Sequence, residues 1–312
     1  MTTPEQTTIA FVGTGVMGLS MAGHLLDAGY PLVVFNRTAE KAAPLLARGA
    51  QWADSAGEAS SQADIVITMV GYPADVEEIY LQPGGIVERA REGAVLVDMT
   101  TSSPALAARI AKAAAARGIA ALDAPVSGGD IGAKNATLTI MVGGDESAFA
   151  RVDPVLCVMG GSVILQGGPG AGQHTKMANQ VAIAGSMLAT VESLAYAERA
   201  GLDPRRVLES IGAGSAASWS LANLAPRILD DNFTPGFYVK HFVKDMRIAI
   251  TSADAMGLDL PGLACAKRLY EHLESHGGGN LGTQALWLLY ADDAARERAG
   301  VDPLARTTNA GT

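Results

Sequence analysis

Short apolar segments recur along the first half of the chain, and stretches with helical character separate them. The apolar segments are residues 9–12, 32–35, 65–69, 95–99, 120–123, 137–142 and 162–165. Predicted helices lie between them, for example over residues 18–28 and 104–117. Continuously apolar strands that alternate with helices are buried on both faces of a sheet. The pattern therefore predicts a doubly wound α/β domain with a mostly parallel sheet.

The pattern changes after the glycine-rich segment 167–172. Residues 173–200 are rich in Ala and contain no proline, which predicts one helix of unusual length. Further predicted helices cover residues 204–211, 222–229, 239–256 and 261–275, and no segment here has a strand pattern. We expect an α/β domain over residues 1–167 and an all-α substrate and oligomerisation domain over residues 168–312. The polar tail after about Ala294 is expected to fray.

Composition and charge narrow the class of protein. The net charge of −9 over 312 residues argues against a nucleic-acid partner, because phosphate binding needs a basic face. No segment has the roughly 20 apolar residues that span a bilayer, and residues 1–8 lack a signal-peptide pattern, so we expect a cytoplasmic protein. Cys157 and Cys265 lie far apart, outside any metal-ligand spacing, and we expect both to be buried in a reducing compartment, with no metal site.

A glycine-rich fingerprint follows the first predicted strand and opens a predicted helix. Its sequence is Gly13-Thr14-Gly15-Val16-Met17-Gly18. In a G-x-G-x-x-G motif the first glycine allows a tight turn, the second lets the backbone approach a pyrophosphate, and the third lets helix and strand pack closely. The helix N-terminus then faces the phosphates with its N–H groups. An ordinary strand–helix turn is the alternative, but this position at the first junction favours an NAD(P)-binding Rossmann domain.

The end of the second predicted strand bears on the choice of cofactor. NAD sites usually place Asp or Glu there to bond the ribose 2′-hydroxyl, whereas this chain has Asn36-Arg37-Thr38. Arg37 can clamp a 2′-phosphate, and Asn36 and Thr38 can add hydrogen bonds. We therefore favour NADP(H) and keep NAD(H) possible, since Arg37 is otherwise an ordinary surface residue.

Polar residues at helical spacing provide candidate acid–base chemistry. Lys176, Asn179 and Gln180 share one helical face, which is otherwise small and apolar. Such a lysine loses part of its hydration, which favours the neutral amine that a general base needs. The alternative is a lysine that snorkels from a buried helix.

Two further segments are weaker signals when taken alone. A turn of Ser127, Gly128 and Gly129 follows a predicted strand and offers backbone N–H groups and a hydroxyl to a carboxylate, or is only a structural turn. Lys244 and Asp245 lie beside apolar residues in a predicted helix, where the alternative is a surface ion pair.

Together these segments resemble the 3-hydroxyisobutyrate dehydrogenase, or β-hydroxyacid dehydrogenase, family of the 6-phosphogluconate dehydrogenase-like superfamily. The matching segments are residues 12–18, 123–129, 170–172 with Lys176, and 244–245. The resemblance implies a Rossmann domain followed by an all-helical domain, with the active site in the cleft between them. It implies that Lys176 is catalytic, that Ser127, Gly128 and Gly129 hold the substrate carboxylate, and that Lys244 and Asp245 lie near the nicotinamide and substrate. Met69, Val70 and Thr101 resemble the family's further cofactor contacts, and residues 36–38 its NADP triplet.

The resemblance implies reversible hydride transfer between a nicotinamide and a small β-hydroxy acid or its semialdehyde, in a homodimer or homotetramer. The substrate stays open among 3-hydroxyisobutyrate, glycerate with tartronate semialdehyde, L-serine, glyoxylate and succinic semialdehyde. Some members place Asn four residues after the lysine, where this chain has Gln180. Either amide can orient the substrate, and we favour Asn179, because other members share the run Ala178-Asn179-Gln180. Imine reduction on the same scaffold and a non-catalytic dinucleotide-binding role are the alternatives, and Lys176 argues against both.

Overall fold

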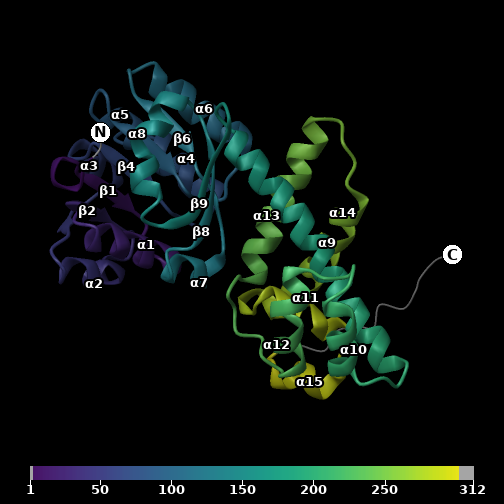
Figure 1. Cartoon of the computed structure of the whole chain (residues 1–312). Helices are drawn as coiled ribbons and strands as arrows, with labels where there is room; N and C mark the ends of the chain where they lie inside the picture. Colours follow the sequence, from purple (N-terminus) through teal and green to yellow (C-terminus); the bar gives the residue numbers. More distant parts are fainter. Residues whose placement is uncertain (1–2, 302–312) are drawn as a thin grey trace. The chain divides into compact units, whose positions relative to one another are not determined.

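The computed structural model describes residues 3–301 of the chain (Figure 1). The chain divides into two compact units, the first ending at Lys176 and the second beginning at Met177. The first is built on a sheet and the second on helices, which confirms the predicted fold class.

The first unit contains one sheet of nine strands, in the order β3-β2-β1-β4-β5-β6-β8-β7, with β9 also paired to β8. The pairings are parallel, except that β6 and β7 each run antiparallel to β8. The strands are β1 Ile9–Val12, β2 Leu32–Phe35, β3 Gln51–Trp52, β4 Ile65–Thr68, β5 Val95–Asp98, β6 Ala120–Asp123, β7 Val126–Ser127, β8 Leu138–Gly143 and β9 Gly160–Gly167. The seven predicted strands are present, and the two strands that the prediction missed, β3 and β7, have two residues each.

Alternate residues of the central strands contribute to two separate apolar cores, one on each face of the sheet. In β1, for example, Ile9 and Phe11 belong to one core, whereas Ala10 and Val12 belong to the other. The covering helices (Figure 1) are α1 Val16–Asp27, α2 Ala43–Leu46, α3 Ala56–Ser61, α4 Pro73–Leu81, α5 Ile86–Arg89, α6 Pro104–Ala115, α7 Gly129–Lys134 and α8 Glu146–Leu156, with 3-10 turns at Pro4–Gln6 and Ala39–Ala42. Burial on both faces explains why these strands are continuously apolar.

The helix α9 extends over Ala171–Arg199, close to the predicted 173–200, and is followed by the helices of the second unit. These are α10 Pro204–Gly212, α11 Trp219–Asn223, α12 Ala225–Leu229, α13 Val239–Ala255, α14 Pro261–Ser275 and α15 Asp293–Arg298, with 3-10 turns at Gly278–Asn280 and Thr283–Leu289. The helix predicted over residues 222–229 is wrong, because the structure has two short helices that meet at Leu224. Pro226 near the start of α12 has no N–H to donate to the preceding turn, so one helix cannot continue through it.

The prediction of a fraying tail is also wrong for its first part. Residues after Ala294 continue α15, whose start is capped by the Asp292 side chain accepting from Ala295 N at 2.8 Å. The buried Arg296 donates from Nε to Leu288 O at 2.8 Å and holds the helix against the preceding turn. The rest of the predicted tail lies outside the described residues.

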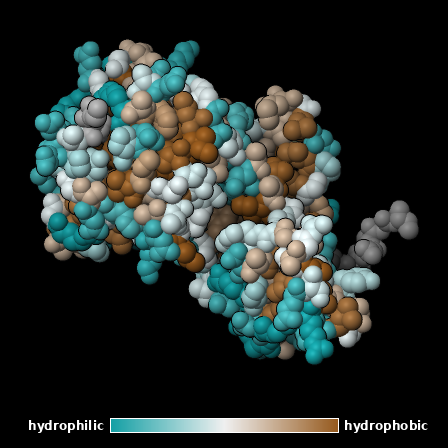
Figure 2. All heavy atoms as spheres, viewed as in Figure 1, coloured by the Kyte–Doolittle hydropathy of each residue, from teal (hydrophilic) through white to brown (hydrophobic). Residues whose placement is uncertain are grey.

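Some apolar side chains remain on the surface. Trp219 is 70% exposed, and Tyr196 and Leu202 near the end of α9 are also exposed. Figure 2 shows apolar areas among polar ones on the visible face.

The two cysteines were expected to be buried, but Cys157 is exposed and Cys265 is only half-buried. Within residues 3–301, no helix combines the length and apolar character needed to cross a bilayer.

Candidate active site

The glycine-rich loop between β1 and α1 has the backbone shape that a dinucleotide pyrophosphate requires. Gly13 has a φ of +100°, and a Cβ built there would lie 2.2 Å from Met69 O, so only glycine fits. A Cβ at Gly18 would lie 1.9 Å from Gly13 O. Around Gly15, by contrast, no atom of the described residues lies within 4 Å of an added Cβ. The loop is thus tightly packed at its two ends and open where α1 begins at Val16, which fits a bound phosphate.

Of the residues after β2, Asn36 is hydrogen-bonded to the protein backbone, whereas Arg37 is exposed. Asn36 Oδ1 accepts from Thr14 N at 2.9 Å, and Asn36 Nδ2 donates to Thr38 O at 2.8 Å. The Asn36 amide therefore shapes the glycine-rich loop. The Arg37 side chain is 86% exposed and lies 3.3 Å from Asp75 Oδ1 of α4, an acidic neighbour that sequence reasoning missed.

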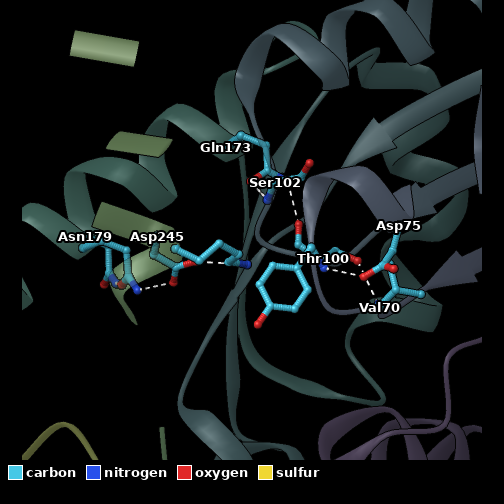
Figure 3. Close-up of polar contacts among 10 residues, drawn as sticks. Val70, Asp75, Thr100, Ser102, Gln173, Asn179 and Asp245 are labelled. Atoms are coloured by element: carbon cyan, nitrogen blue, oxygen red, sulfur yellow. Dashed lines mark hydrogen bonds and ion pairs between the residues drawn. The ribbon is translucent and has the colours of Figure 1, made fainter. Parts of the chain in front are cut away.

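The ends of β4 and β5 are joined by a buried hydrogen-bond network. Val70 N donates to Thr100 Oγ1 at 3.0 Å (Figure 3). Thr100 N donates in turn to Asp98 Oδ1 at 3.0 Å. The same Asp98 oxygen accepts from Thr68 Oγ1 at 2.8 Å, and Thr68 lies 3.0 Å from the Tyr80 hydroxyl. Burial raises the pKa of Asp98 to about 6, although these hydrogen bonds favour the carboxylate.

The predicted cofactor contacts lie along the same strand ends. Met69 and Val70 follow β4 directly and are half-buried, and Thr101 is half-buried in the segment after β5. Carboxyl ends of neighbouring parallel strands meet at one edge of the sheet, where α/β proteins bind their ligands. The network around Thr100 fixes the backbone on both sides of these positions.

The first turn of α9 is fastened to this edge by two buried polar side chains. Asp123 Oδ1 accepts from Gly170 N and Asp123 Oδ2 from Gln173 N, both at 2.7 Å. The Gln173 side chain accepts from Ser102 N at 2.9 Å and donates to Thr100 O at 2.8 Å (Figure 3). Burial raises the pKa of Asp123, while its backbone hydrogen bonds lower it. Asp123 begins one of the segments that resemble the family and Gln173 begins the predicted long helix, but the sequence indicated neither of these roles.

Close backbone packing completes this attachment. A Cβ at Gly172 would lie 2.4 Å from Met141 O and 2.6 Å from Asp123 O, so α9 begins in direct contact with β6 and β8. Lys176 follows one turn later and is only 6% exposed. Its helix is therefore held at a defined position above the strand ends that carry the predicted cofactor contacts.

The Ser-Gly-Gly turn is also well defined. Ser127 ends β7, Gly128 has a φ of +127° and Gly129, the first residue of α7, a φ of +63°. Backbone N–H groups in a turn can form a concave site for an anion, and this turn is where the resemblance predicts the substrate carboxylate. The helix after this turn is held against α1, the helix that follows the glycine-rich loop. His24 Nε2 of α1 lies 3.0 Å from the carbonyl oxygens of Ala133 and Lys134 at the end of α7.

The second unit contains its own buried polar chain. Gln180 Nε2 donates to Asp245 Oδ2 at 2.6 Å, and Asn179 Nδ2 donates to Gln180 Oε1 at 2.7 Å (Figure 3). Asp245 Oδ1 lies 3.1 Å from Lys244 Nζ. The side chains of Lys244 and Asp245 are 13% and 2% exposed, so the alternative of a surface ion pair is excluded. The Gln180 amide uses both ends on protein partners, which distinguishes it from Asn179.

Comparison with known families accounts for both units. Residues 8–168 match the family model described as the NAD binding domain of 6-phosphogluconate dehydrogenase. Residues 170–290 match the model described as NAD-binding of NADP-dependent 3-hydroxyisobutyrate dehydrogenase. The chain belongs to the 3-hydroxyisobutyrate dehydrogenase family. It is an NAD(P)-dependent oxidoreductase of the β-hydroxyacid dehydrogenase type, and it takes a nicotinamide dinucleotide as cofactor.

Individual members of the 3-hydroxyisobutyrate dehydrogenase family are similar along nearly their whole length. An uncharacterized oxidoreductase of Bacillus subtilis, YkwC, is 56% identical and covers 91% of this chain and 98% of its own. The 2-hydroxy-3-oxopropionate reductase of Escherichia coli is 38% identical over 89% of this chain and 95% of its own. The Mycobacterium tuberculosis 3-hydroxyisobutyrate dehydrogenase, solved with L-serine, has a TM-score of 0.86 and 33% identity over 92% of this chain and 99% of its own.

Imine reductases are more distant. The Myxococcus stipitatus imine reductase solved with NADP+ is 21% identical, with a TM-score of 0.61. At that identity the likeness shows a shared fold and carries no argument for imine reduction.

Proposed function

We propose that this dehydrogenase interconverts a small β-hydroxy acid and its semialdehyde, with Lys176 as the general acid and base. One observation carries the proposal. A buried lysine occupies the first turns of a helix that two buried side chains and a glycine contact fasten to the edge of the dinucleotide-binding sheet. A lysine that only snorkels from a helix needs no such attachment.

The chemistry divides among a few groups. The loop over residues 13–18 is expected to hold the cofactor pyrophosphate, and the nicotinamide, when bound, supplies or accepts the hydride. In oxidation, neutral Lys176 takes the proton from the substrate hydroxyl, and in reduction the protonated amine returns it to the forming alkoxide. The ammonium charge also stabilises that alkoxide.

Other residues bind and orient the substrate in this proposal. Ser127, Gly128 and Gly129 hold the carboxylate, because their turn presents a hydroxyl and N–H groups. Asn179 orients the reacting hydroxyl in preference to Gln180, whose amide is occupied by Asn179 and Asp245. Lys244 and Asp245 act as a pair, in which the buried carboxylate fixes the position of the ammonium. We assign this pair to contacts with the substrate and cofactor.

The cofactor preference is proposed to be for NADP(H). Arg37 is exposed, and position 36 carries no carboxylate that would repel a 2′-phosphate. The nearby Asp75 holds Arg37 by an exposed ion pair, and such pairs contribute only about 0–1 kcal/mol. A doubly charged phosphate can therefore displace it.

We also propose that the protein assembles as a homodimer or homotetramer through the helical unit. No residue of α10 is buried in the single chain, although Val207, Leu208 and Ile211 lie along it. The exposed Trp219 and Tyr196 add apolar surface that a second copy would cover.

The proposal is tested by a panel of substrates with both cofactors. The oxidative panel contains 3-hydroxyisobutyrate, glycerate and L-serine, and the reductive panel contains 2-hydroxy-3-oxopropionate, glyoxylate, succinic semialdehyde and a cyclic imine. We expect turnover with at least one hydroxy acid and its aldehyde, faster with NADP(H). Reduction of the imine without turnover of any acid or aldehyde would contradict the proposal.

A further inference from the structure

The Gln173 side chain joins two segments that are far apart in the sequence. It lies in the first turn of α9 and is fully buried. Its Oε1 accepts from Ser102 N at 2.9 Å and its Nε2 donates to Thr100 O at 2.8 Å, across about 70 residues of chain. A neutral carboxamide suits this position, because one end must accept and the other must donate.

These two bonds do more than complete the helix terminus. Asp123 already accepts from the N–H groups of Gly170 and Gln173, which the helix itself leaves unpaired. Neither bond of the Gln173 amide returns to the backbone of α9. Both are made with the segment after β5, which in turn accepts the N–H of Val70 through Thr100 Oγ1.

A second attachment away from the helix axis fixes rotation as well as position. The Asp123 contacts hold the N-terminal end of α9 in place. The Gln173 amide fixes the rotation of α9 about its own axis. Gln173 and Lys176 are three residues apart, so they lie on the same side of the helix. Side chains reach about 5–6 Å from a helix axis, so a rotation of about 10° would move the end of a side chain by about 1 Å.

We propose that Gln173 is a positioning residue that fixes Lys176 relative to the cofactor-contact segment over residues 100–102. The proposal rests on the acid–base role of Lys176 proposed above. A displacement of about 1 Å in a reacting group can reduce turnover by up to about 100-fold. Loss of the amide is therefore expected to lower kcat and to leave dinucleotide affinity nearly unchanged.

The test compares three variants that differ in what they remove. Gln173→Met keeps the size and helical preference but loses both hydrogen bonds. Gln173→Glu, in its protonated form, can restore a donor toward Thr100 O and an acceptor toward Ser102 N. Thr175→Val is the control, because the Thr175 hydroxyl donates only to Ala171 O within the same helix.

We expect kcat to fall about 10- to 100-fold in Gln173→Met, with the NADPH dissociation constant within about threefold of wild type. Gln173→Glu should recover part of kcat, more at low pH than at high pH, and Thr175→Val should match wild type. If Gln173→Met instead weakens NADPH binding and keeps kcat at saturation, Gln173 only supports the cofactor segment and the proposal fails. Should Gln173→Met not fold, a Gln173→Glu enzyme whose kcat follows the wild-type pH profile overturns the proposal equally.

A double-mutant cycle separates this proposal from the role of Lys176. In a Lys176→Ala background, Gln173→Met should cause no further loss of residual turnover, because the group that it positions is gone. Losses that multiply would show that Gln173 acts independently of Lys176 and would overturn the inference. If Lys176→Ala alone keeps turnover near wild type, the proposed function fails first, and that result is read before any Gln173 variant.

Discussion

The buried carboxyl of Asp98 is expected to cost folding free energy at neutral pH. Its pKa in the folded protein is about 6, against an ordinary value of 3.8. Because the pKa is higher in the folded protein than in the unfolded chain, folding favours the protonated carboxyl. The free energy of unfolding therefore decreases as pH rises from about 4 through 6. At about 1.4 kcal/mol per pH unit, the difference amounts to about 3 kcal/mol above pH 7.

The Asp98→Asn variant removes this cost while it keeps the shape of the site. The Asn oxygen can still accept from Thr68 Oγ1 and Thr100 N. Asp98 and Asp123 both line a cavity of about 10 Å³, enough for about one water, which can accept from the new amide. An uncharged group therefore replaces a carboxylate without losing the network.

We expect Asp98→Asn to raise Tm by about 6–12 °C above pH 7, at about 2–4 °C per kcal/mol for a unit of this size. The difference between variant and wild type should shrink steadily as pH falls to about 4.5, because the wild-type carboxyl is then protonated. Differential scanning fluorimetry across this range, without substrate, provides the measurement.

The matched control is Asp145→Asn, because the fold lowers the pKa of Asp145 whereas it raises the pKa of Asp98. Asp145 caps α8 by accepting from Ala148 N at 3.0 Å, and its hydrogen bond from Ser147 lowers its pKa. Its contribution to stability is present above the unfolded pKa and is lost as pH falls, so Asp145→Asn should be least harmful at low pH. A Tm difference for Asp98→Asn that does not change with pH would refute the reasoning about the Asp98 carboxyl.

Four further predictions concern the cofactor preference, the packing of α9 and the oligomeric state. Arg37→Ala should lower kcat/KM for NADPH and leave NADH unchanged, whereas Asp75→Asn should improve NADPH affinity, as steady-state assays with both cofactors would show. Gly172→Ala should destabilise the fold by about 1–3 kcal/mol through overpacking and so lower Tm, because its Cβ would lie 2.4 Å from Met141 O. Light scattering at micromolar concentration should give the mass of a dimer or tetramer, and a monomer mass would contradict the proposed covering of Trp219.

Local pattern predicted the fold because the central strands bury continuous apolar runs, as in β1, β4 and β5. Strands such as β1 and β4 and the glycine-rich loop are encoded within a few residues, so their positions follow from the sequence alone. Strands β3 and β7 have two residues each, which is too short for any periodicity to appear. Pro226 indicates the break between α11 and α12. The prediction of one helix over residues 222–229 followed the apolar pattern around Pro226 instead.

Site residues were predictable where a local spacing indicates them, and not where their partners are far away in the sequence. Lys176 was identified from helical spacing, because its neighbours at three and four residues are part of the same helix. The partners of Gln173 lie about 70 residues away and are backbone groups, which no spacing rule can indicate. Asn36 was predicted as a cofactor contact from its residue type, and the structure shows its amide bonded to Thr14 N and Thr38 O. Its contact with a 2′-phosphate stays a prediction.

The central claim, that Lys176 is the general acid and base, is tested most directly by measuring turnover and NADPH binding on the same Lys176→Ala preparation. The proposed dinucleotide contacts over residues 13–18 belong to the loop before α1 and the first turn of α1, whereas Lys176 lies on α9, so removal of its amine should leave binding nearly intact. Turnover should fall about 100- to 10,000-fold, and Lys176→Arg should not rescue it, because a guanidinium stays protonated. A Lys176→Ala enzyme that keeps more than about a tenth of wild-type kcat would contradict the account, since acid–base catalysis predicts a far larger loss.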